Sequence, residues 1–241
     1  MSIVWKSFGV SMIGPGHIKN GIPNQDYFMD KHSKNFDCIV VSDGVGSCVR
    51  SDRGSQVACR AVIDTVFALN IEDSLPSIDL FVDQIKKNFL EGIAPFPSKE
   101  CSATCLWAIH LAGKIVLGML GDGLAACLLK DGTVVALADD KTEGFSNLVS
   151  ALSEKVTPEN WRYIEIPEEQ CRAILLCTDG ISDDLEDVNG FVCGFLESCI
   201  NKANETNIRN TRDMLLNWPV PKHSDDKTIA CLYPVEVTDE E

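Results

Sequence analysis

The sequence predicts an α+β fold in which antiparallel sheets are covered by helices. Short apolar runs separated by turn sequences follow one another in the middle of the chain, and amphipathic helical stripes come in pairs. Strands and helices do not alternate regularly, as they would in a parallel βαβ fold. We therefore expect meanders of antiparallel strands with helices packed outside them.

The first part of the chain is expected to form strands and two amphipathic helices. Strands are predicted at 3–12 and 38–41. Apolar residues recur at helical spacing over 53–69 and again over 78–89. Ser77 is the expected N-cap of the second helix, and Gly92 is its expected end.

The middle of the chain has the pattern of a strand meander. Four apolar runs lie between Ala-Gly, Gly-Asp-Gly and Asp-Gly turns, at 104–111, 114–120, 124–130 and 133–138. Further strands are expected at 163–166, 173–177 and 228–233. Helices are expected at 145–152, 191–203 and 206–218.

Composition and charge limit the classes of function. The 241 residues include 36 Asp and Glu against 21 Lys and Arg, a formal net charge of −15, so no nucleic-acid partner is expected. No apolar run approaches a membrane span, and no signal-peptide pattern is present. The 11 Cys are scattered, and several lie in apolar runs as small buried hydrophobes do. We expect a reduced, cytoplasmic protein with one domain over 1–241 and an acidic tail at about 235–241.

Acidic turns carry the strongest chemical signal. Three apolar runs end in an Asp-Gly pair, at Asp43, Asp122 and Asp179. Two further carboxylates, Asp26 and Asp225, lie near the two ends of the chain. Each turn alone has a conformational explanation, because Asp and Gly dominate turns. A fourth pair, Asp131-Gly132, is expected to be an ordinary hairpin turn.

Taken as a set, these carboxylates favour a metal site. Carboxylates gathered at strand ends repel one another unless they are protonated or bind a cation. Hard oxygen ligands without Cys or His favour Mg²⁺ or Mn²⁺ over Zn²⁺. The sequence has no nucleophile elbow, phosphate loop or dinucleotide fingerprint. The chemistry most compatible with the set is hydrolysis in which two cations activate a water and polarise a phosphoryl oxygen.

Five short motifs occur in order along the chain. They are Gly-His-Ile-Lys-Asn-Gly-Ile-Pro-Asn-Gln-Asp (16–26), Ser-Asp-Gly-Val-Gly-Ser (42–47), Gly-Asp-Gly (121–123), Thr-Asp-Gly-Ile-Ser-Asp (178–183) and Asp-Asp-Lys-Thr (225–228). In order and spacing they resemble the metal-dependent protein phosphatase family (PPM, type 2C), especially its compact bacterial branch, over about 9–232. The resemblance implies a four-layer αββα sandwich of two antiparallel sheets flanked by helices, with the acidic cluster at one end.

The resemblance also implies roles for the acidic residues. Asp43 would bridge two Mn²⁺ or Mg²⁺ ions, and the Gly44 carbonyl would bind one of them. Asp179 and Asp225 would hold the other ion. Asp26 would order metal-bound water or bind the second metal.

A third, weaker metal site is implied at Asp122 and Asp183. The implied reaction is hydrolysis of phosphoserine or phosphothreonine by metal-activated hydroxide, without a phosphoenzyme. The partners would be a phosphorylated protein substrate and a cognate Ser/Thr kinase.

The chain departs from the family pattern at several positions. Gln25 stands where many members carry glutamate, and Val45 where some carry a histidine proposed as general acid. The arginine that docks the phosphate is replaced by Gly21. His17 and Lys19 are the nearby cations that could contact the phosphate instead.

Two other functions stay open. The missing arginine would suit a catalytically inactive pseudophosphatase that acts as an interaction module. The short segment 142–172, with a reduced substrate flap, would suit a small-molecule phosphomonoesterase. Asp226 replaces the usual asparagine beside Asp225, and we expect it to be a surface charge or to lie behind the metal ligands.

Overall fold

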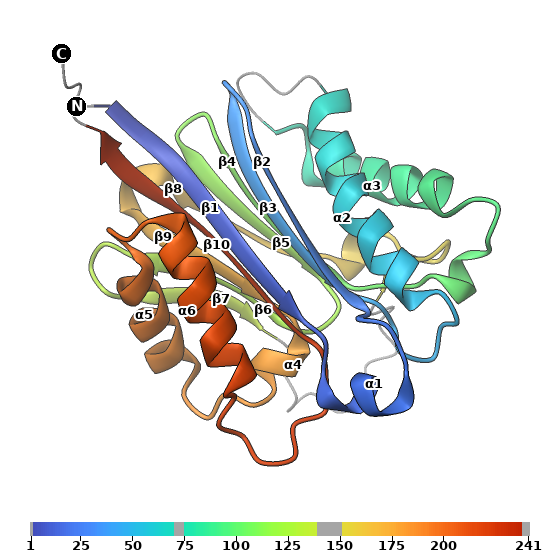
Figure 1. Cartoon of the computed structure of the whole chain (residues 1–241). Helices are drawn as coiled ribbons and strands as arrows, with labels where there is room; N and C mark the ends of the chain where they lie inside the picture. The colour runs from blue at the N-terminus through green and yellow to red at the C-terminus, as the bar shows by residue number, and fades with distance from the viewer. Residues whose placement is uncertain (1, 70–74, 139–150, 238–241) are drawn as a thin grey trace.

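Two five-stranded antiparallel sheets stack face to face, and helices cover both outer faces (Figure 1). The computed structural model describes residues 2–69, 75–138 and 151–237. Most of the expected helix at 145–152, part of the expected flap and the end of the expected tail lie outside these residues. The arrangement confirms the predicted α+β class and the four-layer αββα sandwich.

The first sheet has the strand order β1-β10-β9-β6-β7. Its strands are β1 (Ser2–Met12), β10 (Lys227–Val237), β9 (Cys171–Cys177), β6 (Leu124–Leu129) and β7 (Val134–Ala138). Its outer face packs on α5 (Val188–Cys199) and α6 (Asn204–Leu216). Because β10 extends to Val237, the start of the predicted acidic tail belongs to this sheet.

The second sheet has the strand order β2-β3-β4-β5-β8. Its strands are β2 (Asp26–His32), β3 (Phe36–Asp43), β4 (Cys105–Leu111), β5 (Lys114–Leu120) and β8 (Arg162–Pro167). Its outer face packs on α2 (Ser51–Ala68) and α3 (Ile78–Ile93), where Phe81 meets the Trp107 ring edge-on at 5.0 Å.

Strand β3 shows why its sequence is a continuous apolar run. Ile39 and Val41 face the other sheet, whereas Cys38 and Val40 face the helices. Successive side chains of a strand point to opposite faces, so a strand covered on both sides is apolar throughout. This strand ends at Asp43 and therefore carries that carboxylate out of the core.

The predicted meander over 104–138 is wrong in its connectivity. The hairpin β4-β5 lies in the second sheet, while β6-β7 lies in the first. The Gly121–Gly123 connection thus passes between the sheets, and both glycines have positive φ. Gly92 does not end α3, which continues to Ile93. A Cβ at Gly92 would lie 2.7 Å from Val57, so this glycine permits the close approach of α2.

Short polar elements escaped the sequence prediction. Strand β2 has one buried residue among seven, which leaves no apolar pattern to detect. The six-residue α1 (Pro15–Asn20) and the four-residue α4 (Asp179–Ser182) are too short for a periodic signal. All 11 cysteines are free and ten are buried, which confirms their interpretation as small core residues. Among the described residues, no helix combines the length and apolar character needed to cross a membrane.

A polar network connects the two sheets at the end of β2 that carries His32. His32 Nδ1 lies 2.6 Å from Asp37 Oδ1, and His110 Nδ1 lies 2.9 Å from Asp37 Oδ2. His32 Nε2 contacts Ser7 Oγ on β1 at 2.7 Å. His110 Nε2 lies 3.2 Å from a Glu168 carboxylate oxygen. We call Ser7, His32, Asp37, His110 and Glu168 the distal network. The pair His32 and Asp37 lies at one end of the β2–β3 ladder, and the pair Asp26 and Asp43 lies at the other end.

Candidate metal centre

The acidic motifs meet at one end of the sandwich, where Asp26 and Asp43 lie side by side. Asp26 begins β2, Asp43 ends β3, and the antiparallel register makes them direct cross-strand partners. Each carboxyl group shifts the pKa of the other, so the two groups lie close enough to interact. Two carboxylates this close repel each other unless one is protonated or a cation binds between them.

Backbone contacts fix the end of β3. The Asp43 N–H donates to Thr104 Oγ1 at 2.9 Å, and the Thr104 N–H donates to the Asp43 carbonyl at 2.7 Å. The Gly44 N–H donates to the Gln25 carbonyl at 3.0 Å. A Cβ at Gly44 would lie 2.2 Å from the Ser51 carbonyl oxygen, so only glycine fits between β3 and the start of α2.

The first sheet brings its own carboxylates to the same place. Asp179 follows β9 and opens α4, while Asp225 precedes β10. The Thr178 hydroxyl donates to Asp26 across the two sheets at 2.8 Å. A Cβ at Gly180 would lie 1.9 Å from the carbonyl oxygen of Asp226, so α4 and the 225–226 segment are in tight contact.

Burial and neighbouring negative charges raise the pKa values of the inner carboxyl groups. Burial, together with the charges of Asp26, Asp179 and Asp225, raises the pKa of Asp43. Burial also raises the pKa of Asp26, and its hydrogen bond from Thr178 offsets only part of this effect. Protonation or a bound cation would relieve such a cluster.

The outer carboxyl groups extend the cluster toward solvent. Burial is the largest cause of the raised pKa of Asp179, followed by the charges of Asp122, Asp225 and Asp183. Asp26 is buried, Asp43, Asp122 and Asp179 are half-buried, and Asp183 and Asp225 are exposed. The predicted acidic residues thus form one graded cluster that opens to solvent.

The donor set fits a hard divalent cation. Its donors are carboxylate oxygens, which Mg²⁺ and Mn²⁺ prefer, and their mutual repulsion shows where positive charge is needed. Within the described part of the chain, no three His, Cys, Asp or Glu side chains already stand in metal-ligand geometry. The carboxylates therefore lie near one another, but not yet at the distances of metal ligands.

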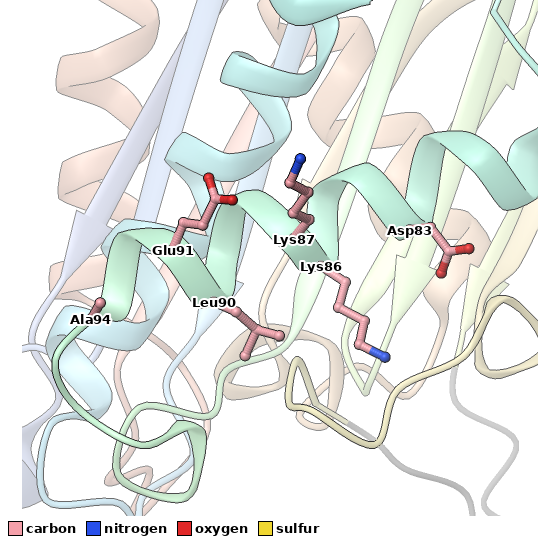
Figure 2. Close-up of a pocket in the computed structure, with 6 residues that line it drawn as sticks. All are labelled: Asp83, Lys86, Lys87, Leu90, Glu91 and Ala94. Carbon is pink, nitrogen blue, oxygen red and sulfur yellow. The ribbon is translucent and has the colours of Figure 1, made fainter.

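One of two hollows in the surface borders this site. A pocket of about 250 Å³ is lined by Asp179, Asp183 and Asp225 together with Lys222 and His223. A larger hollow of about 600 Å³ follows α3, where its lining residues include Lys86, Lys87 and Leu90 (Figure 2). None of the predicted site residues lines the second hollow, so it has no part in this site.

The predicted phosphate contacts lie on α1. The Gly16 N–H donates to the Ser224 carbonyl at 2.9 Å, which holds α1 against the segment before β10. His17 is half-buried, with Nδ1 2.8 Å from an Asp226 carboxylate oxygen. Lys19 is exposed on the same helix.

Asp226 is the residue that sequence analysis described least well. It is not a surface charge, because it is buried and accepts hydrogen bonds from the backbone N–H groups of Gly14 and Gln25, each at 2.6 Å. Its own backbone N–H donates to Asp225 Oδ1 at 2.9 Å. Two neighbouring Asp residues give no local signal that one is exposed and the other buried.

Comparisons with known proteins place the chain in a family. The family model for protein phosphatase 2C matches residues 13–216. No curated protein sequence matches the chain at a significant level.

Solved structures share the fold at low identity. The chain is similar to RsbX in complex with magnesium, at 13% identity and a TM-score of 0.64 with 96% of each chain covered. It is similar to the catalytic domain of the serine/threonine phosphatase PstP with two manganese ions, at 16% identity and a TM-score of 0.61, covering 98% of this chain and 100% of that one. It is also similar to PppA of Pseudomonas aeruginosa, at 15% identity and a TM-score of 0.64, covering 97% of this chain and 100% of that one. Because the family model spans most of the sequence, the chain belongs to the protein phosphatase 2C family.

Proposed function

We propose that this chain is a metal-dependent serine/threonine protein phosphatase that hydrolyses phosphoserine and phosphothreonine in a protein substrate. The observation that carries the proposal is the cluster of Asp26, Asp43, Asp179 and Asp225, which come from four segments of both sheets. Family membership supports the same reaction class. The magnesium of RsbX and the two manganese ions of PstP support the same class of cation.

Each carboxylate has a proposed role. Asp43 and the Gly44 carbonyl oxygen would hold one cation, and Asp43, Asp179 and Asp225 the other. When bound, the two cations would activate a water and polarise a phosphoryl oxygen. Asp26, held by the Thr178 hydroxyl, would order water or take part in binding.

Outer residues would complete the site. Asp122 and Asp183 would form a third, weaker cation site, consistent with their effect on the pKa of Asp179. His17 and Lys19 would supply positive charge for the substrate phosphate. A Ser/Thr kinase that phosphorylates the same substrate would be the opposing partner.

The test is hydrolysis of p-nitrophenyl phosphate and of a phosphothreonine peptide by the purified chain. Arms with Mn²⁺, Mg²⁺ and EDTA would be compared for wild type and Asp179→Asn. Asp131→Asn is the matched control, because Asp131 also precedes a glycine but occupies an exposed hairpin turn where it caps the Thr133 N–H. We expect metal-dependent turnover of the peptide that Asp179→Asn loses and Asp131→Asn keeps.

Other outcomes separate the alternatives. A folded protein without turnover in any arm would contradict the proposal and favour an inactive interaction module. Turnover of p-nitrophenyl phosphate and nucleotide phosphates, but of no phosphopeptide, would favour a small-molecule phosphomonoesterase. Equal turnover in EDTA and Mn²⁺ would refute the metal assignment.

A further inference from the structure

Three separate groups form hydrogen bonds with the carboxylate of Asp226. Its Oδ1 accepts from the Gly14 N–H at 2.6 Å. Its Oδ2 accepts from the Gln25 N–H at 2.6 Å and lies 2.8 Å from His17 Nδ1. The side chain is 1% exposed, and a buried carboxylate is stable only when such donors surround it. Asp226 therefore connects both ends of the 14–25 segment to the start of β10.

The contact with Asp226 fixes the orientation of the His17 ring. A carboxylate only accepts hydrogen bonds, so Nδ1 carries the proton that is shared with Asp226. Nε2 is the other polar atom of the ring, on its far side from Asp226. The His17 side chain is 19% exposed, so part of the ring is open to a ligand.

The same segment lies at the rim of the acidic cluster. A Cβ at Gly14 would lie 2.3 Å from the Asp225 backbone, and Gln25 directly precedes Asp26. Figure 1 shows α1 and α4 at the same end of the sandwich. His17 is thus anchored beside the place where the proposed cations would bind.

The family resemblance implies a phosphate-docking arginine at position 21, where this chain has a glycine without a side chain. Gly21 ends α1 in the left-handed region, with φ at 64°. An arginine there would be strained, because side chains other than glycine rarely adopt this conformation. The helix that presents His17 therefore ends in a backbone conformation that disfavours arginine.

From these contacts we propose that Asp226 is a positioning residue for His17, and that His17 Nε2 binds the substrate phosphoryl group in place of the missing arginine. The inference rests on the proposed phosphatase function. An imidazolium donates through both nitrogens, so it can bind Asp226 at one and a phosphoryl oxygen at the other. Lys19, exposed on the same helix, is the alternative cation.

A double-mutant cycle tests the coupling between the two residues. His17→Ala, Asp226→Asn and the double variant would be compared by kcat and KM for the phosphothreonine peptide in Mn²⁺. Asparagine keeps one acceptor oxygen at this position. Its amide N–H groups would face one of the groups that donate to Asp226 in the wild type, and that hydrogen bond would be lost. We expect His17→Ala to raise KM about tenfold, as for loss of one charge-assisted hydrogen bond. We expect Asp226→Asn to raise KM in the wild-type background as well. In the His17→Ala background, the same substitution should raise KM by less than about twofold.

Two controls separate positioning from a general structural effect. Asn20→Ala changes an exposed residue of the same helix, whose amide bonds the Gly16 carbonyl, and should leave KM unchanged. Lys19→Ala should raise KM less than His17→Ala. Fully additive effects of His17→Ala and Asp226→Asn, or an unchanged KM in His17→Ala, would overturn the inference.

A readout without turnover distinguishes failure of this inference from failure of the proposed function. NMR of the His17 ring nitrogens would report the ring tautomer in wild type and in Asp226→Asn. Inorganic phosphate added with Mg²⁺ should shift the Nε2 resonance in wild type, and the shift should weaken in Asp226→Asn. An inactive wild type would refute the proposed function alone, while an Nε2 resonance that ignores phosphate would refute the docking role.

Discussion

Replacing Asp37 with asparagine should destabilise the fold by about 2–3 kcal/mol near pH 6. Asp37 accepts from both histidines of the distal network, at 2.6 Å from His32 Nδ1 and 2.9 Å from His110 Nδ1. Asparagine would keep one of these bonds and set an amide N–H against the other imidazole N–H. The Asp37 side chain is 15% exposed, so water replaces part of the loss and the cost stays at or below the ~3–5 kcal/mol of breaking a fully buried pair.

The effect should depend on pH in a defined direction. The hydrogen bond to Asp37 raises the pKa of His32 above its ordinary 6.5. Burial lowers the pKa of His110, but Asp37 and Glu168 outweigh it, so this pKa is also raised above 6.5. Burial favours a higher pKa for Asp37, but the bonds from both histidines outweigh it and hold the pKa below 3.8.

The sign of each contribution follows from these shifts. The histidine contribution is complete below pH 6.5 and is lost as pH rises through the raised values. The Asp37 contribution is present above pH 3.8 and is lost as pH falls through the lowered value. The network should therefore stabilise the protein most between about pH 4 and 6.5, and less both in alkaline solution and below the lowered pKa of Asp37.

Thermal and urea unfolding at about pH 5.5, 7 and 9 would measure the effect. At pH 5.5 the melting temperature of Asp37→Asn should fall by about 4–12 °C, and the gap to wild type should narrow at pH 9. Asp64→Asn is the control, because it removes an exposed pair with Arg60 on α2 that is worth about 0.5 kcal/mol or less. A gap that is constant with pH would refute the assignment of the histidines as the titrating partners.

Three further changes test the acidic end of the sandwich. Asp43→Asn should abolish turnover but raise the melting temperature in EDTA, because it removes repulsion from the cluster; thermal unfolding with and without Mn²⁺ would show that it also loses the metal-induced rise. Gly180→Ala should cost about 1–3 kcal/mol and reduce turnover, because its Cβ would lie 1.9 Å from a carbonyl oxygen, whereas Gly194→Ala in α5 meets open space and should be neutral or stabilising in urea unfolding. Arg162→Gln should lower the melting temperature by a few degrees, because Arg162 donates to the Gly121 carbonyl at 2.7 Å beside the Gly-Asp-Gly connection.

The sequence was most informative where burial is continuous. Strands β3, β4, β5 and β9 are buried over most of their length, and their apolar runs gave both their presence and their approximate bounds. Strand β2 was missed, because an exposed edge strand with one buried residue has no pattern to detect. The sequence also could not show which sheet each strand joins. A Gly-Asp-Gly turn within one sheet and a Gly-Asp-Gly connection between two sheets have the same composition.

The acidic cluster was predictable because each of its turns follows or precedes a strand. Apolar runs that end in Asp place a carboxylate where a strand leaves the core, and the family motifs supplied which ends meet. The groups that hold these carboxylates were not predictable. The Thr178 bond to Asp26 joins residues 152 positions apart, and the His17 bond to Asp226 joins residues 209 apart.

Among the residues that the structure describes, neutral groups rather than cations hold the inner carboxylates in place. A hydroxyl bonds Asp26, and backbone groups fix the end of the strand that carries Asp43. An arginine or lysine could position these groups equally well, but it would neutralise the charge that a divalent cation needs. The cluster is thus preorganised at the cost of repulsion in the absence of metal, and cation binding should stabilise the fold.

The neighbouring residues Asp225 and Asp226 should therefore respond in opposite ways to the same substitution. Asp225 is an exposed member of the cluster, whereas the carboxylate of Asp226 is buried and accepts hydrogen bonds from three donors. Asp225→Asn should weaken Mn²⁺ binding in calorimetric titration and change the melting temperature in EDTA little. Asp226→Asn should lower the free energy of unfolding by about 2–3 kcal/mol and therefore the melting temperature in EDTA. It should leave the Mn²⁺ affinity closer to wild type. The reverse pattern would show that Asp226 is the metal ligand and that its bonds to the 14–25 segment are incidental.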